Sequence, residues 1–211
     1  MKDRFAMFGI MCVLLTGLLT ALLIPEEYVL KMIDDERQAN YAFLGYEAAR
    51  NTEGRAERWF DALFVKTGVM DASYRATTTP EKEGLRDLDR LNEILDQGLQ
   101  WAETRLRVLW AAAFQFMVRI SVAVMWLPFI VLILIPFIVD SLVSRKIKAA
   151  SFAITSPHLQ ALGSRSLFWL AIGYLVLQLL PLKLHPIWTP VFIGVASSAI
   201  WLGISHFAKR A

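Results

Sequence analysis

Few residues of this chain have the side chains and the spacing that enzymatic chemistry requires. The histidines, His158, His185 and His206, have no carboxylate or cysteine at ligand spacing, which argues against a metal site. The single cysteine, Cys12, has no partner for an intramolecular disulfide. The sequence contains no Walker-type phosphate loop and no GxSG segment of the kind that intramembrane serine proteases use. The sequence therefore predicts a protein that is not an enzyme and that binds no metal or cofactor.

Charged residues that could instead bind partners follow a long apolar stretch. Four cations share one basic segment, namely Arg145, Lys146, Lys148 and Arg165. Such side chains can dock on an acidic face of a partner protein or contact the phosphates of anionic lipid. The simpler interpretation is that they only fix the orientation of the chain in a membrane.

Arg119 is a separate candidate because it interrupts the apolar stretch that ends at Val139. One interpretation places Arg119 at the outer boundary of a membrane span. The other places it inside the bilayer against a protein partner, because an unpaired cation there is costly. A small transporter or channel could also use an intramembrane arginine to line a polar path.

The elements that must carry these residues are membrane helices. Hydrophobic residues make up 56% of the 211 positions and charged residues 19%, and the apolar residues form four blocks. Backbone amides in lipid must be paired within the chain, so each block is expected to be helical. The sequence predicts an all-α integral membrane protein with four transmembrane helices and a helical extracytoplasmic domain between spans one and two. The predicted order is a cytoplasmic amino end and first span over 1–24, a helical periplasmic domain over 25–119, the second span over 120–139, a basic cytoplasmic loop over 140–165, the third span over 166–182, a short outer turn over 183–186, the fourth span over 187–207 and a cytoplasmic tail over 208–211.

The distribution of charge predicts which side of the membrane each segment occupies. Cations exceed anions at the amino end, in the segment 140–165 and at the carboxyl end, whereas 25–119 carries 13 cations and 17 anions. Short loops rich in Lys and Arg stay in the cytoplasm, so both termini and the basic loop are expected there. The net charge of +3 then reflects topology, and no direct contact with nucleic acid is expected.

Within the predicted periplasmic domain, apolar residues recur at helical spacing. Thr52 is a predicted helix cap, and Gly68 is predicted to end the helix whose apolar face runs from Trp59 to Phe64. A longer helix over 85–109 has a heptad seam with one polar core position, and the seam includes Leu88, Asn92, Leu95 and Leu99. The seam could pack on the Trp59–Phe64 helix of the same chain, or it could associate with a second copy.

Two features of the predicted spans concern their shape and packing. With Arg119 at the outer boundary, 120–139 has about the 20 residues that cross a bilayer. Pro128 and Pro136 predict a kink within that span. Close packing of the fourth span is predicted by two pairs of small residues, Gly194 with Ser198 and Ala199 with Gly203.

Two stretches of the chain resemble a known family. They are ERWFDALFVKTGV at 57–69 and VDSLVSRKIKAASFAITSPHLQALGSR at 139–165, followed by two closely spaced apolar runs and a short basic tail. This combination resembles the uncharacterised inner-membrane protein family that integrating conjugative elements and large conjugative plasmids carry. The segment 140–165 is the most specific part of the resemblance.

The resemblance implies a role in conjugative DNA transfer by a type IV secretion system. Genes of that family typically lie beside the gene for the coupling-protein ATPase, so this ATPase or another membrane subunit of the system is the expected partner. The family has no known catalytic residues, and none is transferred to this chain. The resulting expectation is a non-enzymatic subunit of the bacterial inner membrane. The alternative is a small transporter or channel-like protein in which Arg119 lines a polar path.

Overall fold

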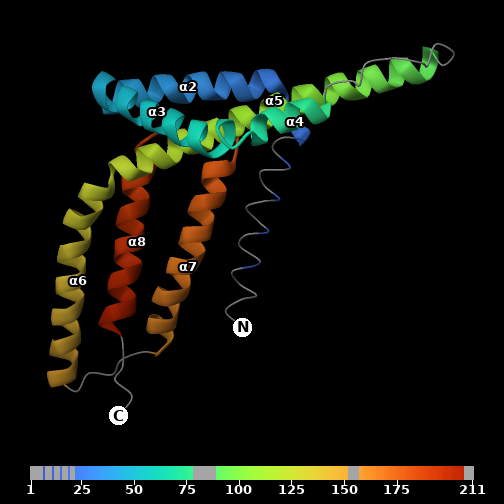
Figure 1. The fold of residues 1–211 in the computed structure, drawn as a ribbon. Coiled ribbons are helices and arrows are strands. Elements are labelled where there is room, and N and C mark those ends of the chain that lie inside the picture. The colour runs from blue at the N-terminus through green and yellow to red at the C-terminus, as the bar shows by residue number, and fades with distance from the viewer. Residues whose placement is uncertain are drawn as a thin grey trace. The chain divides into compact units, whose positions relative to one another are not determined.

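The computed structural model describes residues 22–77, 89–151 and 157–206, together with Met7, Met11, Leu15 and Leu19. Within these residues all regular elements are helical, comprising seven α-helices, α2 to α8, and one π-helical turn (Figure 1). The predicted all-α class is confirmed for this part of the chain. The chain divides into two compact units: the first unit is Met1–Ser121 with Leu179–Leu184, and the second unit is Val122–Gln178 with His185–Ala211.

The first unit begins with two helices that a glycine separates. α2 spans Glu26–Leu44 and α3 spans Tyr46–Phe60, and the two lie side by side (Figure 1). Gly45 reverses the chain between them with φ 84° and ψ 161°. Only glycine adopts this conformation without strain, because it lacks a Cβ. The sequence pattern did not predict this break, since apolar spacing continues across Gly45.

Replacing Gly45 by alanine is expected to destabilise the protein by about 1–2 kcal/mol, because an alanine at φ 84° is strained although its Cβ would meet open space. Thermal unfolding of the detergent-solubilised protein, followed by tryptophan fluorescence, measures the change. Gly98→Ala is the matched control, because that Cβ also meets open space but on helical backbone, where alanine gains about 0.5–1 kcal/mol. Equal stability of the two variants would contradict the strained turn.

A π-helical turn, η1, continues α3 over Asp61–Val65. Gly68 ends this segment with φ 73°, and α4 follows over Val69–Thr77. A left-handed glycine after the last helical turn is a common helix terminator, so the predicted role of Gly68 is confirmed.

Thr52 is not a helix cap, and this prediction is wrong. Thr52 lies in the middle of α3, is buried, and its hydroxyl donates to the carbonyl of Ala49 at 2.6 Å. The helix starts earlier because the reversal at Gly45 sets its first turn. Ala49, Thr52 and Ala56 form the buried stripe of α3, and their small side chains permit a close approach of a neighbouring helix.

The long helix α5, Asp89–Met125, packs on these elements through residues of the first unit. Trp110 contacts the rings of Phe60 and Phe64 at centroid distances of 6.0 and 5.3 Å, and Phe114 lies 5.6 Å from Phe60. Aromatic pairs in such edge-to-face arrangements contribute about 0.5–1.5 kcal/mol beyond the burial of their area. The long helix therefore does pack on the predicted Trp59–Phe64 face, but the contacts come from residues beyond the heptad seam.

A helix break lies within 120–139, the stretch that was predicted to form a kinked second span. α5 ends at Met125, Trp126 forms a turn, and α6 runs over Leu127–Ala150. Pro128 lies in the first turn of α6, where its missing N–H cannot continue the hydrogen-bond ladder of α5. The predicted distortion at Pro128 is thus a complete break, whereas α6 continues through Pro136.

The second unit consists mainly of α6, α7 over Pro157–Leu179 and α8 over Trp188–Ser205. α8 lies between α6 and α7 (Figure 1). A Cβ added at Gly163 of α7 would lie 2.5 Å from the Gly203 nitrogen and 3.0 Å from the Ala199 carbonyl oxygen, so the two helices touch through their backbones. The predicted small pair of Ala199 and Gly203 therefore lies at this close contact between helices. A Cβ added at Gly194, in the other predicted pair, would meet open space.

Among the described residues, three helices are long and apolar enough to cross a membrane: Gln97–Met125, Leu127–Lys148 and Trp188–Ser205. Arg165–Leu179 is apolar but shorter. The first predicted span, within 1–24, lies mostly outside the described residues. The three apolar helices fit a membrane protein, and the predicted count of four spans stays a prediction.

Candidate functional site

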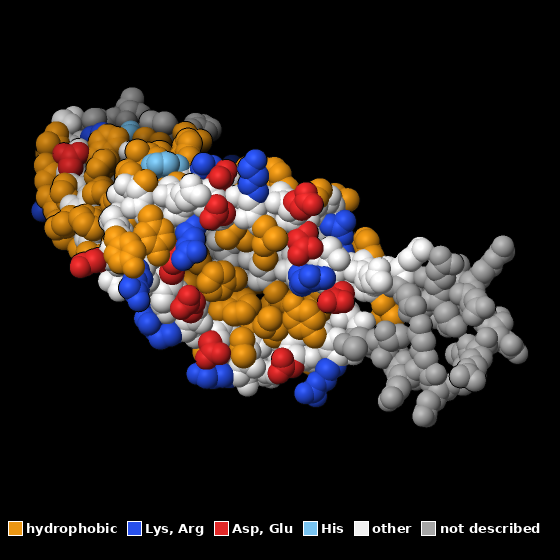
Figure 2. Space-filling view, turned by 90° about the horizontal axis from the view of Figure 1, so that it is seen from above, with side chains coloured by type: hydrophobic (Ala, Val, Ile, Leu, Met, Phe, Trp, Pro, Cys, Tyr) orange, Lys and Arg blue, Asp and Glu red, His pale blue; other side chains and the backbone are white. Residues whose placement is uncertain are grey.

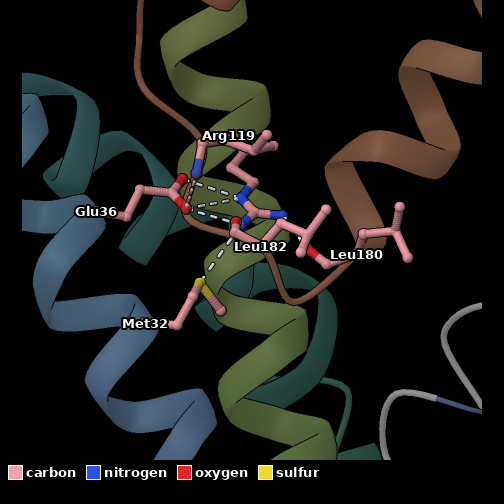
Figure 3. A network of polar contacts seen from close by, with 6 residues as sticks. Met32, Glu36, Arg119, Leu180 and Leu182 are labelled. Carbon is pink, nitrogen blue, oxygen red and sulfur yellow. Dashed lines mark hydrogen bonds and ion pairs between the residues drawn. The ribbon is translucent and has the colours of Figure 1, made fainter.

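Arg119 and Glu36 form a buried ion pair within the first unit (Figure 3). Arg119 Nε lies 2.9 Å from Glu36 Oε1, and Arg119 Nη2 lies 2.7 Å from Glu36 Oε2. The two side chains are 5% and 3% exposed. α5 supplies the guanidinium, and the buried face of α2 supplies the carboxylate. Two parallel N–H···O bonds of this kind make the pair both strong and directional.

The same guanidinium binds the segment that follows α7 (Figure 3). Nη1 donates to the carbonyl oxygen of Leu180 at 2.8 Å, and Nη2 donates to that of Leu182 at 2.7 Å. The carbonyl groups at the end of a helix and just beyond it receive no hydrogen bond from the helix backbone. Pro181 has no N–H, so α7 cannot continue and provide these donors. Glu36 adds a contact by accepting the backbone N–H of Leu184 at 3.3 Å. Arg119 and Glu36 together therefore hold residues 180–184 against α2 and α5.

The contacts of this pair support the structure, because they tie residues 180–184 to α2 and α5. Burial of two charges costs several kcal/mol per ion, and the pair is tolerated because neighbouring groups satisfy both of its members. The guanidinium and the carboxylate bond to each other and to backbone groups of residues 180–184. Nothing in the described residues favours the interpretation in which Arg119 lines a transport path.

A second polar contact joins α3 to α5 in the first unit. Ser121, fully buried, donates its hydroxyl hydrogen to the carbonyl of Thr52 at 2.7 Å and accepts the Nε–H of Arg55 at 2.9 Å. Arg55 also donates to the Ser121 carbonyl at 3.3 Å and lies over the ring of Trp59. These bonds satisfy the buried hydroxyl of Ser121 and tie the middle of α3 to α5.

The predicted partner-binding cations all lie in the second unit, and they differ in exposure and in their hydrogen bonds. Lys146 and Arg165 are exposed. Lys148 is half-buried, with Nζ 3.1 Å from His206 Nε2 and 3.4 Å from the Ser205 carbonyl oxygen. A cation at this position meets the partial negative charge at the C-terminal end of α8. Lys148 therefore contributes to the packing of α6 on α8.

α6 and α8 share a further polar contact near the same predicted segment. Trp201 Nε1 donates to Asp140 Oδ2 at 2.6 Å. Arg145 is half-buried and has interactions of its own. The described contacts thus leave Lys146 and Arg165 as the most accessible cations of the predicted set.

The predicted association seam is described only in part. Leu88 lies outside the described residues, and for Asn92 and Leu95 the structure gives the helical backbone alone. Leu99 is half-buried in α5. Self-association through the helix over 85–109 therefore stays a prediction.

Glu36 is the member of the buried pair that the sequence pattern did not reveal. It lies in the run DDER, which resembles a solvated surface, and its partner lies 83 positions away. The available signal was its register, because Val29, Met32, Glu36 and Asn40 recur at helical spacing and are the buried residues of α2. A carboxylate in that stripe is buried and therefore needs a polar or charged partner.

No group of three or more His, Cys, Asp or Glu suited to a metal ion occurs in the described part of the chain. Residues 22–208 match the model of a protein family that is described as DtrJ-like, IncC plasmid conjugative DNA transfer protein. The match includes all of α2 to α8. No curated protein sequence and no solved structure matches the chain.

Proposed function

The chain belongs to the DtrJ-like family of IncC plasmid conjugative DNA transfer proteins, and we propose that it is a non-enzymatic inner-membrane subunit that partners the coupling-protein ATPase. A role in conjugative DNA transfer follows from the family. Three helices of membrane-spanning length and composition among the described residues fit a membrane protein of such a system. In the proposed topology both termini and the segment 140–165 lie in the cytoplasm.

The exposed cations of the second unit carry the proposed contact. Lys146 lies near the carboxyl end of α6 and Arg165 lies in the amino-terminal half of α7, so both flank the connection between these helices. Neither has a carboxylate at ion-pair distance within the residues that the structure describes. An acidic face of the ATPase would supply the missing partners, and anionic lipid is the other proposed contact. Lys148 supports the helix packing that positions them.

Reversing both exposed charges, in Lys146→Glu with Arg165→Glu, is expected to reduce DNA transfer and recovery of the coupling ATPase in pull-downs by about tenfold or more. Lys31→Glu with Arg75→Glu is the matched control, because these exposed cations lie in the first unit, and it should keep wild-type values. Protein level and membrane insertion are measured for each variant. Unchanged transfer and recovery, with the reversed protein inserted normally, would refute the contact.

A further inference from the structure

A groove with a volume of about 210 Å³ lies within the second unit, among α6, α7 and α8. One long side of the groove is formed by α8, whose lining residues recur at intervals of three and one from Thr189 to Ile200. Ile130 and Leu134 line it from α6, and Tyr174 lines it from α7. None of its described lining residues is charged, in contrast to the face shown in Figure 2, where acidic and basic side chains are interspersed with hydrophobic ones.

The groove has a polar end and an apolar end. The hydroxyl oxygens of Tyr174 and Thr189 lie 3.5 Å apart, and Thr189 belongs to the first turn of α8. One of these hydroxyls can donate to the other, which leaves one hydroxyl hydrogen of the pair without a described acceptor. The hydroxyl of Ser197, further along the groove, already donates to the carbonyl of Ile193 at 2.8 Å. The free donor of the groove therefore lies at its Thr189 end.

The length of the groove matches one leaflet of a bilayer. α8 is one of the helices that are long and apolar enough to cross a membrane. Thr189 lies at the start of this helix, and Ile200 lies deeper by a rise of about 16 Å, at about 1.5 Å per residue. The hydrocarbon core of a bilayer is about 30 Å thick, so one leaflet contributes about 15 Å. Trp188 is exposed at the same end of α8 as Thr189, and tryptophan is enriched at membrane interfaces.

The size and the lining of the groove select one kind of occupant. Apolar cavities of about 150 Å³ stay dry and bind apolar molecules, so hydrocarbon rather than water is expected here. A partner helix is about 10–12 Å across, which is too wide for this groove. One side chain of such a helix would fill about one turn, whereas the lining covers about three turns of α8. An extended hydrocarbon chain is one carbon wide, about 4 Å at van der Waals contact, and fits both the width and the length.

We propose that this groove holds one acyl chain of a membrane phospholipid, with the ester group near Tyr174 and Thr189 and the methyl end near Ile200. The free hydroxyl hydrogen can donate to the ester carbonyl, which lies where an acyl chain joins the headgroup region. The chain then occupies space that no described side chain fills. The inference rests on the membrane location that is part of the proposed function.

Photoreactive lipid tests the site in vesicles of phosphatidylethanolamine and phosphatidylglycerol that contain the purified protein. A small fraction of the phosphatidylethanolamine carries a diazirine in one acyl chain, placed either next to the ester or at the methyl end. The first probe should mark residues around Thr189, and the second should mark residues around Ile200 and Leu134. Each should exceed the marking of the exposed positions Val195 and Leu132 about fivefold or more. Equal marking of groove and exposed positions, or the same pattern from both probes, would overturn the proposal.

Two variants separate a resident chain from general contact with lipid. Ala196→Phe fills the middle of the groove, so it should lower the groove adducts about tenfold and keep the unfolding temperature, since the ring enters existing space. Val195→Phe, on the exposed side of α8, is the matched control and should leave the groove adducts unchanged. Tyr174→Phe with Thr189→Val keeps the shape but removes both hydroxyls, and it should lower the groove adducts about fivefold.

The adducts at exposed positions distinguish failure of this site from failure of the membrane location. Adducts at Val195 and Leu132 without a preference for the groove would overturn the lipid site alone. If neither the groove nor the exposed positions were marked, the membrane location would fail together with the site. Groove adducts that survive both Ala196→Phe and the double hydroxyl variant would also refute the proposal.

Discussion

Replacing Arg119 by leucine is expected to destabilise the protein by about 3–5 kcal/mol, which is enough to deplete the folded protein in cells. The substitution leaves Glu36 buried with only the backbone N–H of Leu184 as a described hydrogen-bond partner. It also removes the donors to the carbonyls of Leu180 and Leu182, which then lose their contact to α5. Thermal unfolding of the detergent-solubilised protein and its steady-state level in membranes measure the loss.

The double variant Glu36→Leu with Arg119→Leu should recover much of that loss, because it removes both buried charges together. Arg107→Leu is the matched control on the same helix. Arg107 pairs with Glu103 at 3.6 Å, but both side chains are about half exposed, so the change should stay within about 1 kcal/mol. Equal losses for Arg119→Leu and Arg107→Leu, or no recovery in the double variant, would show that the buried pair has no such role.

Gly163→Ala is expected to destabilise the second unit by about 1–3 kcal/mol, because the added methyl group collides with the backbone of α8. The atoms that it meets are the nitrogen and Cα of Gly203, at 2.5 and 2.7 Å, and backbone cannot turn away as a flexible side chain can. Helices of membrane proteins depend on such close contacts, since lipid offers little hydrophobic driving force for their association. The unfolding temperature in detergent is the measurement.

Gly173→Ala on the same helix is the matched control, because its Cβ would meet open space. It should be neutral or should stabilise by about 0.5–1 kcal/mol. If the two alanine variants unfold at the same temperature, α7 and α8 do not touch through Gly163 and Gly203.

Features that depend on local patterns could be predicted from the sequence. Runs of apolar residues predicted helices, the position of Gly68 after an apolar face predicted a helix end, and the pair Ala199 with Gly203 predicted close packing. Each of these needs only neighbouring residues or one helix face. The family resemblance was likewise carried by contiguous residues, and the family match over 22–208 confirms it.

Features that depend on distant residues or on competition between local signals could not be predicted. Thr52 has the side chain of a cap, but the reversal at Gly45 starts α3 before it. Pro128 predicted a kink, yet the turn at Trp126 separates two helices. The pairing of Glu36 with Arg119 joins residues 83 positions apart, and no local pattern specifies which cation a buried carboxylate finds.

Sidedness is the central claim of the proposed function, because Lys146 and Arg165 reach a cytoplasmic ATPase only if the segment 140–165 faces the cytoplasm. Cysteines are introduced one at a time at Asn51 and Ser151, which are both exposed, in a chain whose own cysteine is removed by Cys12→Ser. A membrane-impermeant maleimide then reports on which side of the membrane each introduced cysteine lies. In intact spheroplasts, the proposed topology predicts labelling at position 51 at once and at position 151 only after permeabilisation. Labelling of position 151, but not 51, in intact spheroplasts would contradict it.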